Sequence, residues 1–107
     1  MLPGALIDRI ELACLYIISE HPDGPIKIGR SKSVKSRMSS LQTGNCRQLT
    51  LEAVFTMPAD QVVLAERCLH EELENRALIG EWFDLPTRFM REYMPDFFLA
   101  NGFDVIT

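Results

Sequence analysis

The stretch ACLYIISEHPDGPIKIGR, residues 13–30, contains the two segments that decide the fold. Residues 13–19 are β-branched and aromatic, which is typical of a buried strand. Residues 26–30, IKIGR, alternate between apolar and other side chains, as a half-buried strand does. The turn-forming HPDG between the two segments favours an antiparallel hairpin.

Three helices and one more strand are predicted after the hairpin. Ser33 is placed to cap a helix that begins at Val34, and Gly44 supplies its end. The later elements are a strand over residues 49–57, a helix opened by Pro58 and Asp60 that runs to about Glu74, and a helix capped by Thr87 that runs to about Ala100, which Pro95 should break or kink. The chain is therefore predicted to be an α+β domain in the order β-β-α-β-α-α, with a three-stranded sheet covered by helices.

Length and composition are those of an ordinary globular protein. The 107 residues suffice for one domain with a modest core, and 47% are hydrophobic and 24% charged. No apolar run approaches the roughly 18 residues that span a bilayer, and the first residues lack the basic start of a signal peptide. We therefore expect a cytoplasmic protein without membrane contact.

The three cysteines are Cys14, Cys46 and Cys68, and they form no CxxC pair. Their odd number and their spacing indicate reduced thiols. A zinc site formed by Cys46, Cys68 and His70 is disfavoured, because structural zinc sites use paired and regularly spaced ligands.

Charge is unevenly distributed along a chain whose net charge is -4. Residues 25–51 include six basic residues and no acidic one, whereas residues 60–104 include ten acidic residues and four arginines. The basic residues are Lys27, Arg30, Lys32, Lys35, Arg37 and Arg47. A low overall pI argues against a general nucleic-acid coat, but a local basic face can neutralise a few phosphates. A solvated loop is the alternative.

One acidic residue falls on the apolar face of the second predicted helix. Val62, Ala65, Leu69 and Leu73 form a stripe at helical spacing, and Glu66 lies within it. A carboxylate on a core-facing stripe loses hydration unless it is paired or binds a cation. Glu66 is therefore a metal-ligand candidate, with a snorkelling or arginine-paired side chain as an equal alternative. His70, one turn later, is close enough to share its site.

Three further positions also combine polar chemistry with a core-facing location. Arg37 flanks the stripe of the first predicted helix, where its guanidinium could bind a phosphate or pair with an acidic residue. If the hairpin forms, Tyr16 and Lys27 share one sheet face, and Gly29 leaves room beside them for a backbone or a ligand. The Trp82–Phe83 pair is interpreted as an aromatic plug closing the sheet rather than as a platform for bases.

LYII at 15–18, KIG at 27–29, Arg37 in a helix and Glu66 in a later helix together resemble the GIY-YIG nuclease superfamily. LQTGN, AERCLHEEL and GEWF resemble the compact branch of that superfamily catalogued as a phage-type DNA-binding domain. The resemblance covers about residues 13–85. It implies a single GIY-YIG-like domain over residues 1–107, with a three-stranded antiparallel sheet, flanking helices and a C-terminal helix at about 87–100.

The resemblance also implies a role for each matching residue. Tyr16 would be the general base near the attacking water, Arg37 would hold the scissile phosphate, and Glu66 would bind the single divalent ion, Mg²⁺ or Mn²⁺. Lys27 stands at the tyrosine of the second motif, where it could lower the phenol pKa of Tyr16 or hold a phosphate. Arg30 and His70 would support this site, and the remaining nucleic-acid contacts would come from Lys32, Lys35 and Arg47.

Three departures from the family pattern leave the activity open. Lys27 replaces tyrosine, Leu41 stands where many active members have His or Tyr, and the first motif lacks its glycine. The first hypothesis is a divalent-metal-dependent endonuclease that hydrolyses DNA phosphodiester bonds. The alternatives are a catalytically weak or inactive DNA-binding module and a protein-interaction domain. Because the domain is compact, we expect either that a separate partner or a homodimer supplies sequence specificity, or that the domain recognises nucleic-acid structure or the backbone without sequence specificity.

Overall fold

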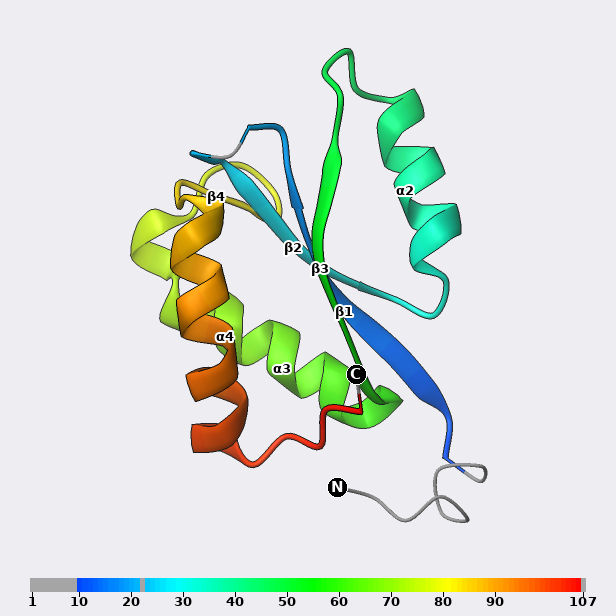
Figure 1. Ribbon diagram of the computed structural model, residues 1–107, viewed down its shortest axis with the longest axis vertical. Coiled ribbons are helices and arrows are strands. Elements are labelled where there is room, and N and C mark those ends of the chain that lie inside the picture. Colours follow the sequence, from blue (N-terminus) through cyan, green and yellow to red (C-terminus); the bar gives the residue numbers. More distant parts are fainter. Residues whose placement is uncertain (1–9, 22, 107) are drawn as a thin grey trace.

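The computed structural model describes residues 10–21 and 23–106, which form a four-stranded sheet with helices on both faces (Figure 1). Its elements are β1 (Leu12–Ser19), β2 (Ile26–Ser31), α2 (Val34–Thr43), β3 (Thr50–Pro58), α3 (Ala59–Glu72), a 3₁₀ turn (Glu74–Arg76), β4 (Trp82–Phe83) and α4 (Thr87–Asn101). All strand pairs are antiparallel, in the order β3-β1-β2-β4. The α+β class and the hairpin are thus confirmed.

The number of strands is a correction to the prediction, because GEWF adds the two-residue strand β4 to the free edge of β2. Ile26 pairs with Phe83 and Lys27 with Trp82. Both aromatic side chains are packed, Phe83 into the main core and Trp82 against the smaller cluster on the opposite face. A two-residue strand has no alternating pattern of its own, so periodicity could not show it.

The two faces of the sheet have separate apolar cores, which follow from the alternation of β1. Leu15 and Ile17 face α3 and α4 and belong to the main core, while Tyr16 and Ile18 face α2. The predicted stripe of α2 lies on this second cluster, and the buried stripe of α3 lies on the main one. Figure 1 shows α2 on one side of the sheet and α3 with α4 on the other.

The structure corrects two predictions about α4, because Thr87 does not cap the helix and Pro95 does not break it. Thr87 is the first residue of the helix rather than its cap, and Pro86 precedes it as the N-cap. The helix also continues through Pro95 without a break. Proline removes one backbone hydrogen bond, but the buried residues Met94 and Phe97 on either side of it keep both halves packed on the sheet. Within the described ranges, none of the helices combines the length and the apolar character that crossing a bilayer demands.

Tyr16 and Gly29 are direct partners across β1 and β2, and a Cβ atom at position 29 would overlap the Tyr16 hydroxyl group. Gly29→Ala is therefore expected to lower the free energy of unfolding by about 1–3 kcal/mol, because the ring must move. In a Tyr16→Ala background the same change should cost little, since alanine is otherwise preferred to glycine in a strand. Urea unfolding of the four proteins measures both values.

Gly44→Ala provides the matched control. Its Cβ atom would lie 3.9 Å from the nearest atom, Leu41 O, and would meet no obstruction. If Gly29→Ala were equally costly with and without the tyrosine ring, the proposed overlap would not be the cause.

Candidate active site

A polar pocket of about 250 Å³ opens where α2, α3 and the edge of β2 meet. It is lined by Tyr16, Lys27, Arg30, Arg37, Leu41, Glu66 and Glu81. The structure thus brings together, from two strands and two helices, the four residues that sequence reasoning placed at the centre of a site, with Arg30 beside them. The hydrocarbon side chain of Leu41 is the apolar part of this lining.

The floor of the pocket is set by Tyr16 and Gly29. The ring of Tyr16 lies over Gly29 on the α2 face of the sheet, and the Tyr16 residue is 2% exposed. The sequence prediction that Gly29 leaves room for a backbone or a ligand was therefore wrong in one respect, since the Tyr16 ring itself fills that room. Lys27 lies on the same sheet face, as predicted from the strand alternation.

Glu66 reaches the pocket because β4 covers only part of the edge of β2. The register of β2 with β4 includes Ile26 and Lys27 and ends there. Arg30, three residues further, points to the α3 face, and its Nε donates to Glu66 Oε1 at 3.3 Å. The pocket consequently extends around the uncovered edge of β2, from Tyr16 on one face to Glu66 on the other.

Glu66 is half-buried and incompletely paired. Its side chain is 15% exposed, and the Oε2 atom is buried with no hydrogen-bond partner among the described residues. Burial raises the pKa of Glu66, and the charge of Glu81 raises it further, against the opposing effects of His70 and Arg30. A buried carboxylate oxygen without a partner fits an oxygen-preferring divalent cation, since Mg²⁺ is often held by one or two carboxylates together with water and phosphate.

The zinc alternative finds no support in the arrangement of side chains. Among residues 10–21 and 23–106, no three His, Cys, Asp or Glu side chains gather closely enough to hold a metal ion. Cys46 is exposed in the loop after α2, and Cys68 is a free, partly buried thiol on α3.

The pKa of the Tyr16 phenol is raised above its ordinary value. Burial is the main cause, Glu81 adds to it, and Arg37 opposes it. Lys27 pairs with Glu81, with Nζ and Oε2 3.0 Å apart. In the pocket without a bound cation, the Tyr16 phenol therefore keeps its proton at neutral pH.

Glu81 is the pocket residue that sequence reasoning missed. In the sequence, GEWF indicated the family resemblance, and Trp82–Phe83 was interpreted as an aromatic plug. No function was predicted for Glu81. Its location depends on β4, whose formation the sequence does not signal. Glu81 lies more than 50 residues from Lys27 in the sequence, and only the pairing of β2 with β4 brings the two residues together.

His70 does not line the pocket. Its Nε2 donates to the Ile28 carbonyl at 3.0 Å, and its ring contacts Phe83 edge to face with centroids 5.0 Å apart. This hydrogen bond gives the Ile28 carbonyl a partner just beyond the end of the β2–β4 pairing. His70 therefore supports the site by holding β2 and by the effect of its charge on the Glu66 pKa, rather than by entering the pocket.

The outlying basic residues lie apart from the pocket lining. Lys32 pairs with Glu11, and Arg47 Nε lies 3.7 Å from Glu20 Oε2. Lys35 is exposed on α2. The sequence analysis gave these residues outlying nucleic-acid contacts rather than a place at the centre of the site, and none of the three lines the pocket.

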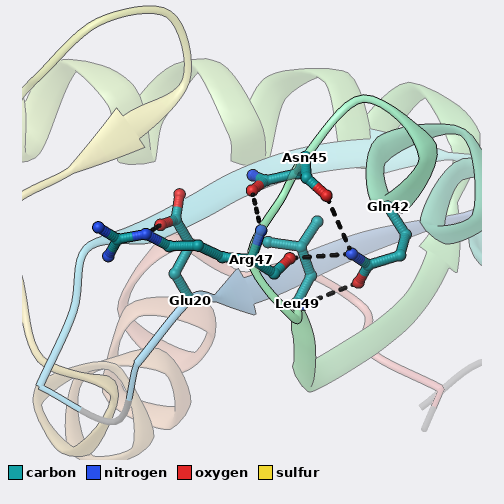
Figure 2. A network of polar contacts seen from close by, with 5 residues as sticks. All are labelled: Glu20, Gln42, Asn45, Arg47 and Leu49. Atoms are coloured by element: carbon teal, nitrogen blue, oxygen red, sulfur yellow. Dashed lines mark hydrogen bonds and ion pairs between the residues drawn. The ribbon is translucent and has the colours of Figure 1, made fainter.

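The loop that bears Arg47 is organised by the side chain of Gln42 (Figure 2). Gln42 Nε2 donates to the Arg47 carbonyl at 2.9 Å, and its Oε1 accepts from the Leu49 amide at 2.8 Å. Asn45 Oδ1 accepts from the Arg47 amide at 2.9 Å. The glutamine of the LQTG motif is thus structural.

The T5orf172 domain profile matches residues 13–96, which is most of the chain. The chain belongs to the T5orf172 domain family. This membership indicates a phage-type DNA-binding or nuclease-like module. No curated protein and no solved structure matches the chain significantly.

The raised pKa of Glu66 predicts a specific pH dependence of stability. Between the carboxyl pKa of the unfolded chain and the higher pKa of the folded protein, the folded protein binds more protons, so stability falls as the pH rises through this window. Glu66→Gln is therefore expected to raise the free energy of unfolding at pH 8 without divalent ions. The gain should shrink as the pH falls through this window and vanish below the carboxyl pKa of the unfolded chain, where wild-type Glu66 is protonated in both states.

Urea unfolding of both proteins in a chelating buffer at several pH values measures this difference. Glu71→Gln, which removes the same charge from an exposed position on α3, is the matched control. A gain that persists unchanged at pH 4 would contradict the electrostatic cause.

Proposed function

We propose that the protein is a divalent-metal-dependent endonuclease that hydrolyses DNA phosphodiester bonds at a GIY-YIG-type site. The convergence of four residues on one polar pocket supports this proposal; they are Tyr16, Lys27, Arg37 and Glu66. These residues come from β1, β2, α2 and α3 and lie far apart in the sequence. Their convergence therefore supports the family resemblance separately from the motifs.

Glu66 would hold the cation through Oε2, the oxygen that has no partner among the described residues. A bound Mg²⁺ or Mn²⁺ supplies Lewis-acid stabilisation of the charge that develops on the phosphate. Arg30, whose Nε contacts the other oxygen, Oε1, would compete with the cation through its positive charge, and its side chain, 51% exposed, has room to move away. Once released, Arg30 could contact a phosphate oxygen.

Arg37 would bind the scissile phosphate. It forms no ion pair with the residues that the structure describes, and its guanidinium lines the pocket. A planar fork of donors suits two oxygens of one phosphate. Arg37 would therefore neutralise the same negative charge from a side that Glu66 does not occupy.

Tyr16 would accept the proton of the attacking water. With Tyr16 in its phenolate form, a new P–O bond would form from water while the water proton passes to the phenolate oxygen, and the P–O ester bond would break with the leaving alkoxide taking a proton from solvent water. Because burial and Glu81 raise the Tyr16 pKa, the residue needs positive charge nearby to act at neutral pH. Arg37 already opposes the shift.

Plasmid cleavage in Mg²⁺ or Mn²⁺ tests the proposal. Glu66→Gln keeps the shape of the side chain, and it is expected to lower the cleavage rate by about 10²-fold or more, because transition-state charge loses its stabilisation. Glu71→Gln on the same helix should cleave like the wild type. If Glu66→Gln preparations cleave as fast as the wild type, the activity belongs to a contaminant and the proposal fails.

A second prediction concerns competition between Arg30 and the cation for Glu66. Arg30→Gln is expected to tighten Mn²⁺ binding by roughly two- to fivefold, the effect of removing a partly exposed ion pair. Electron paramagnetic resonance of free Mn²⁺ measures the affinity without any cleavage assay. Arg67→Gln, at an exposed neighbouring position, is the control, and an unchanged affinity in Arg30→Gln would refute the competition.

A DNA-binding module without chemistry is the second candidate, and two observations favour it. Leu41 puts an apolar side chain into the pocket, and the Tyr16 pKa is raised. This candidate predicts no metal-dependent cleavage. DNA binding would fall steeply with salt, weaken in Arg37→Ala and survive Glu66→Gln.

A further inference from the structure

Lys27 brings a positive charge into a partly buried position. Its side chain is 13% exposed, and it lies on the sheet face that holds Tyr16. An ammonium group at such a site needs a fixed counter-charge, because its removal from water is otherwise unfavourable. Glu81, whose Oε2 lies 3.0 Å from Lys27 Nζ, supplies it.

Glu81 holds this position through its backbone as well as its side chain. Its carbonyl accepts a hydrogen bond from the Ile28 amide at 3.2 Å, which places the residue next to Lys27 along β2. Trp82 pairs with Lys27 across the two strands, and its ring centroid lies 5.9 Å from Nζ. The ammonium group is therefore fixed from two sides by consecutive residues of the same segment.

The charge of the pocket depends on this pair. The lining includes three cations, Lys27, Arg30 and Arg37, and two carboxylates, Glu66 and Glu81. Without Glu81, the pocket would have one more uncompensated positive charge. DNA phosphates would then be attracted whether or not a divalent ion is present.

We propose that Glu81 is a positioning residue that fixes the Lys27 ammonium beside Tyr16 and offsets its charge until a cation and a phosphate enter the pocket. The proposal rests on the proposed function, which gives Lys27 a phosphate to meet. On phosphate entry, Lys27 exchanges part of its contact with Glu81 for the phosphate oxygen. Glu81 thereby lowers the affinity for DNA without the ion and favours the productive placement of Lys27.

The test measures binding of a fluorescently labelled DNA duplex to the full chain by anisotropy, in a chelating buffer and over a series of salt concentrations. Glu81→Gln is expected to lower the Kd roughly two- to fivefold and to steepen the salt slope by about 1. Asp84→Asn, which removes the same charge from an exposed position in the same segment, should change neither value appreciably.

A double-mutant cycle with Lys27→Gln shows whether Glu81 acts through Lys27. In that background Glu81→Gln should leave the DNA affinity nearly unchanged. Glu81→Asp, which keeps the charge and shortens the reach, should bind DNA with an affinity between those of the wild type and Glu81→Gln. Circular dichroism checks that each variant is folded, and Glu81→Asp still decides the question if the glutamine variant is not.

Two outcomes would overturn the proposal. One is an affinity of Glu81→Gln equal to that of Asp84→Asn, and the other is an unchanged effect in the Lys27→Gln background. Where the wild type cleaves DNA, Glu81→Gln should also lower kcat while KM falls, a split that general destabilisation does not produce. A wild type that never cleaves refutes the proposed catalysis alone, because the binding measurements need no cleavage.

Discussion

The close contact between Tyr16 and Gly29 is the constraint on which the candidate site depends. Direct pairing of these residues across β1 and β2 lets the end of the Tyr16 ring lie where a side chain at position 29 would otherwise be, because glycine has none. The ring fills the α2 face there and brings the phenol oxygen to the edge of β2. Arg30, the next residue along, then points to the opposite face and meets Glu66. One backbone register therefore determines which groups come together around that edge.

Polar groups in this pocket are arranged by burial as much as by charge. Glu66 and Tyr16 lose hydration, and in each case burial is the largest cause of a raised pKa. Lys27 pairs with Glu81, and Arg30 pairs with Glu66. The second pair is incomplete, since Glu66 Oε2 has no partner among the described residues. A site that leaves a buried carboxylate oxygen unsatisfied is less stable than it could be. Such a cost is expected where the structure serves binding of a ligand rather than folding.

The sequence predicted what depends on local pattern and missed what depends on tertiary pairing. The hairpin, the α2 stripe and the α3 stripe follow from periodicity and turn residues, and all three are present. The convergence of Tyr16, Lys27, Arg37 and Glu66 was anticipated because the family resemblance supplied the spatial information that spacing lacks. Strand β4 and the position of Glu81 had no local signal. Thr87 and Pro95 show the reverse case, in which packing of α4 on the sheet overrides local preferences.

The basic segment of an acidic chain can now be divided by environment. Lys32 and Arg47 are largely exposed and paired with Glu11 and Glu20, and such surface pairs contribute little because water and salt screen them. Exchange of these carboxylates for phosphates would therefore gain little affinity. Arg37 is also exposed, but it lines the polar pocket and has no ion-pair partner among the described residues, so no carboxylate competes with a phosphate there. A net charge of -4 opposes long-range attraction of DNA, so short-range cations such as those of the pocket matter most for any contact with a phosphate. This arrangement suits recognition of one phosphate and its neighbours.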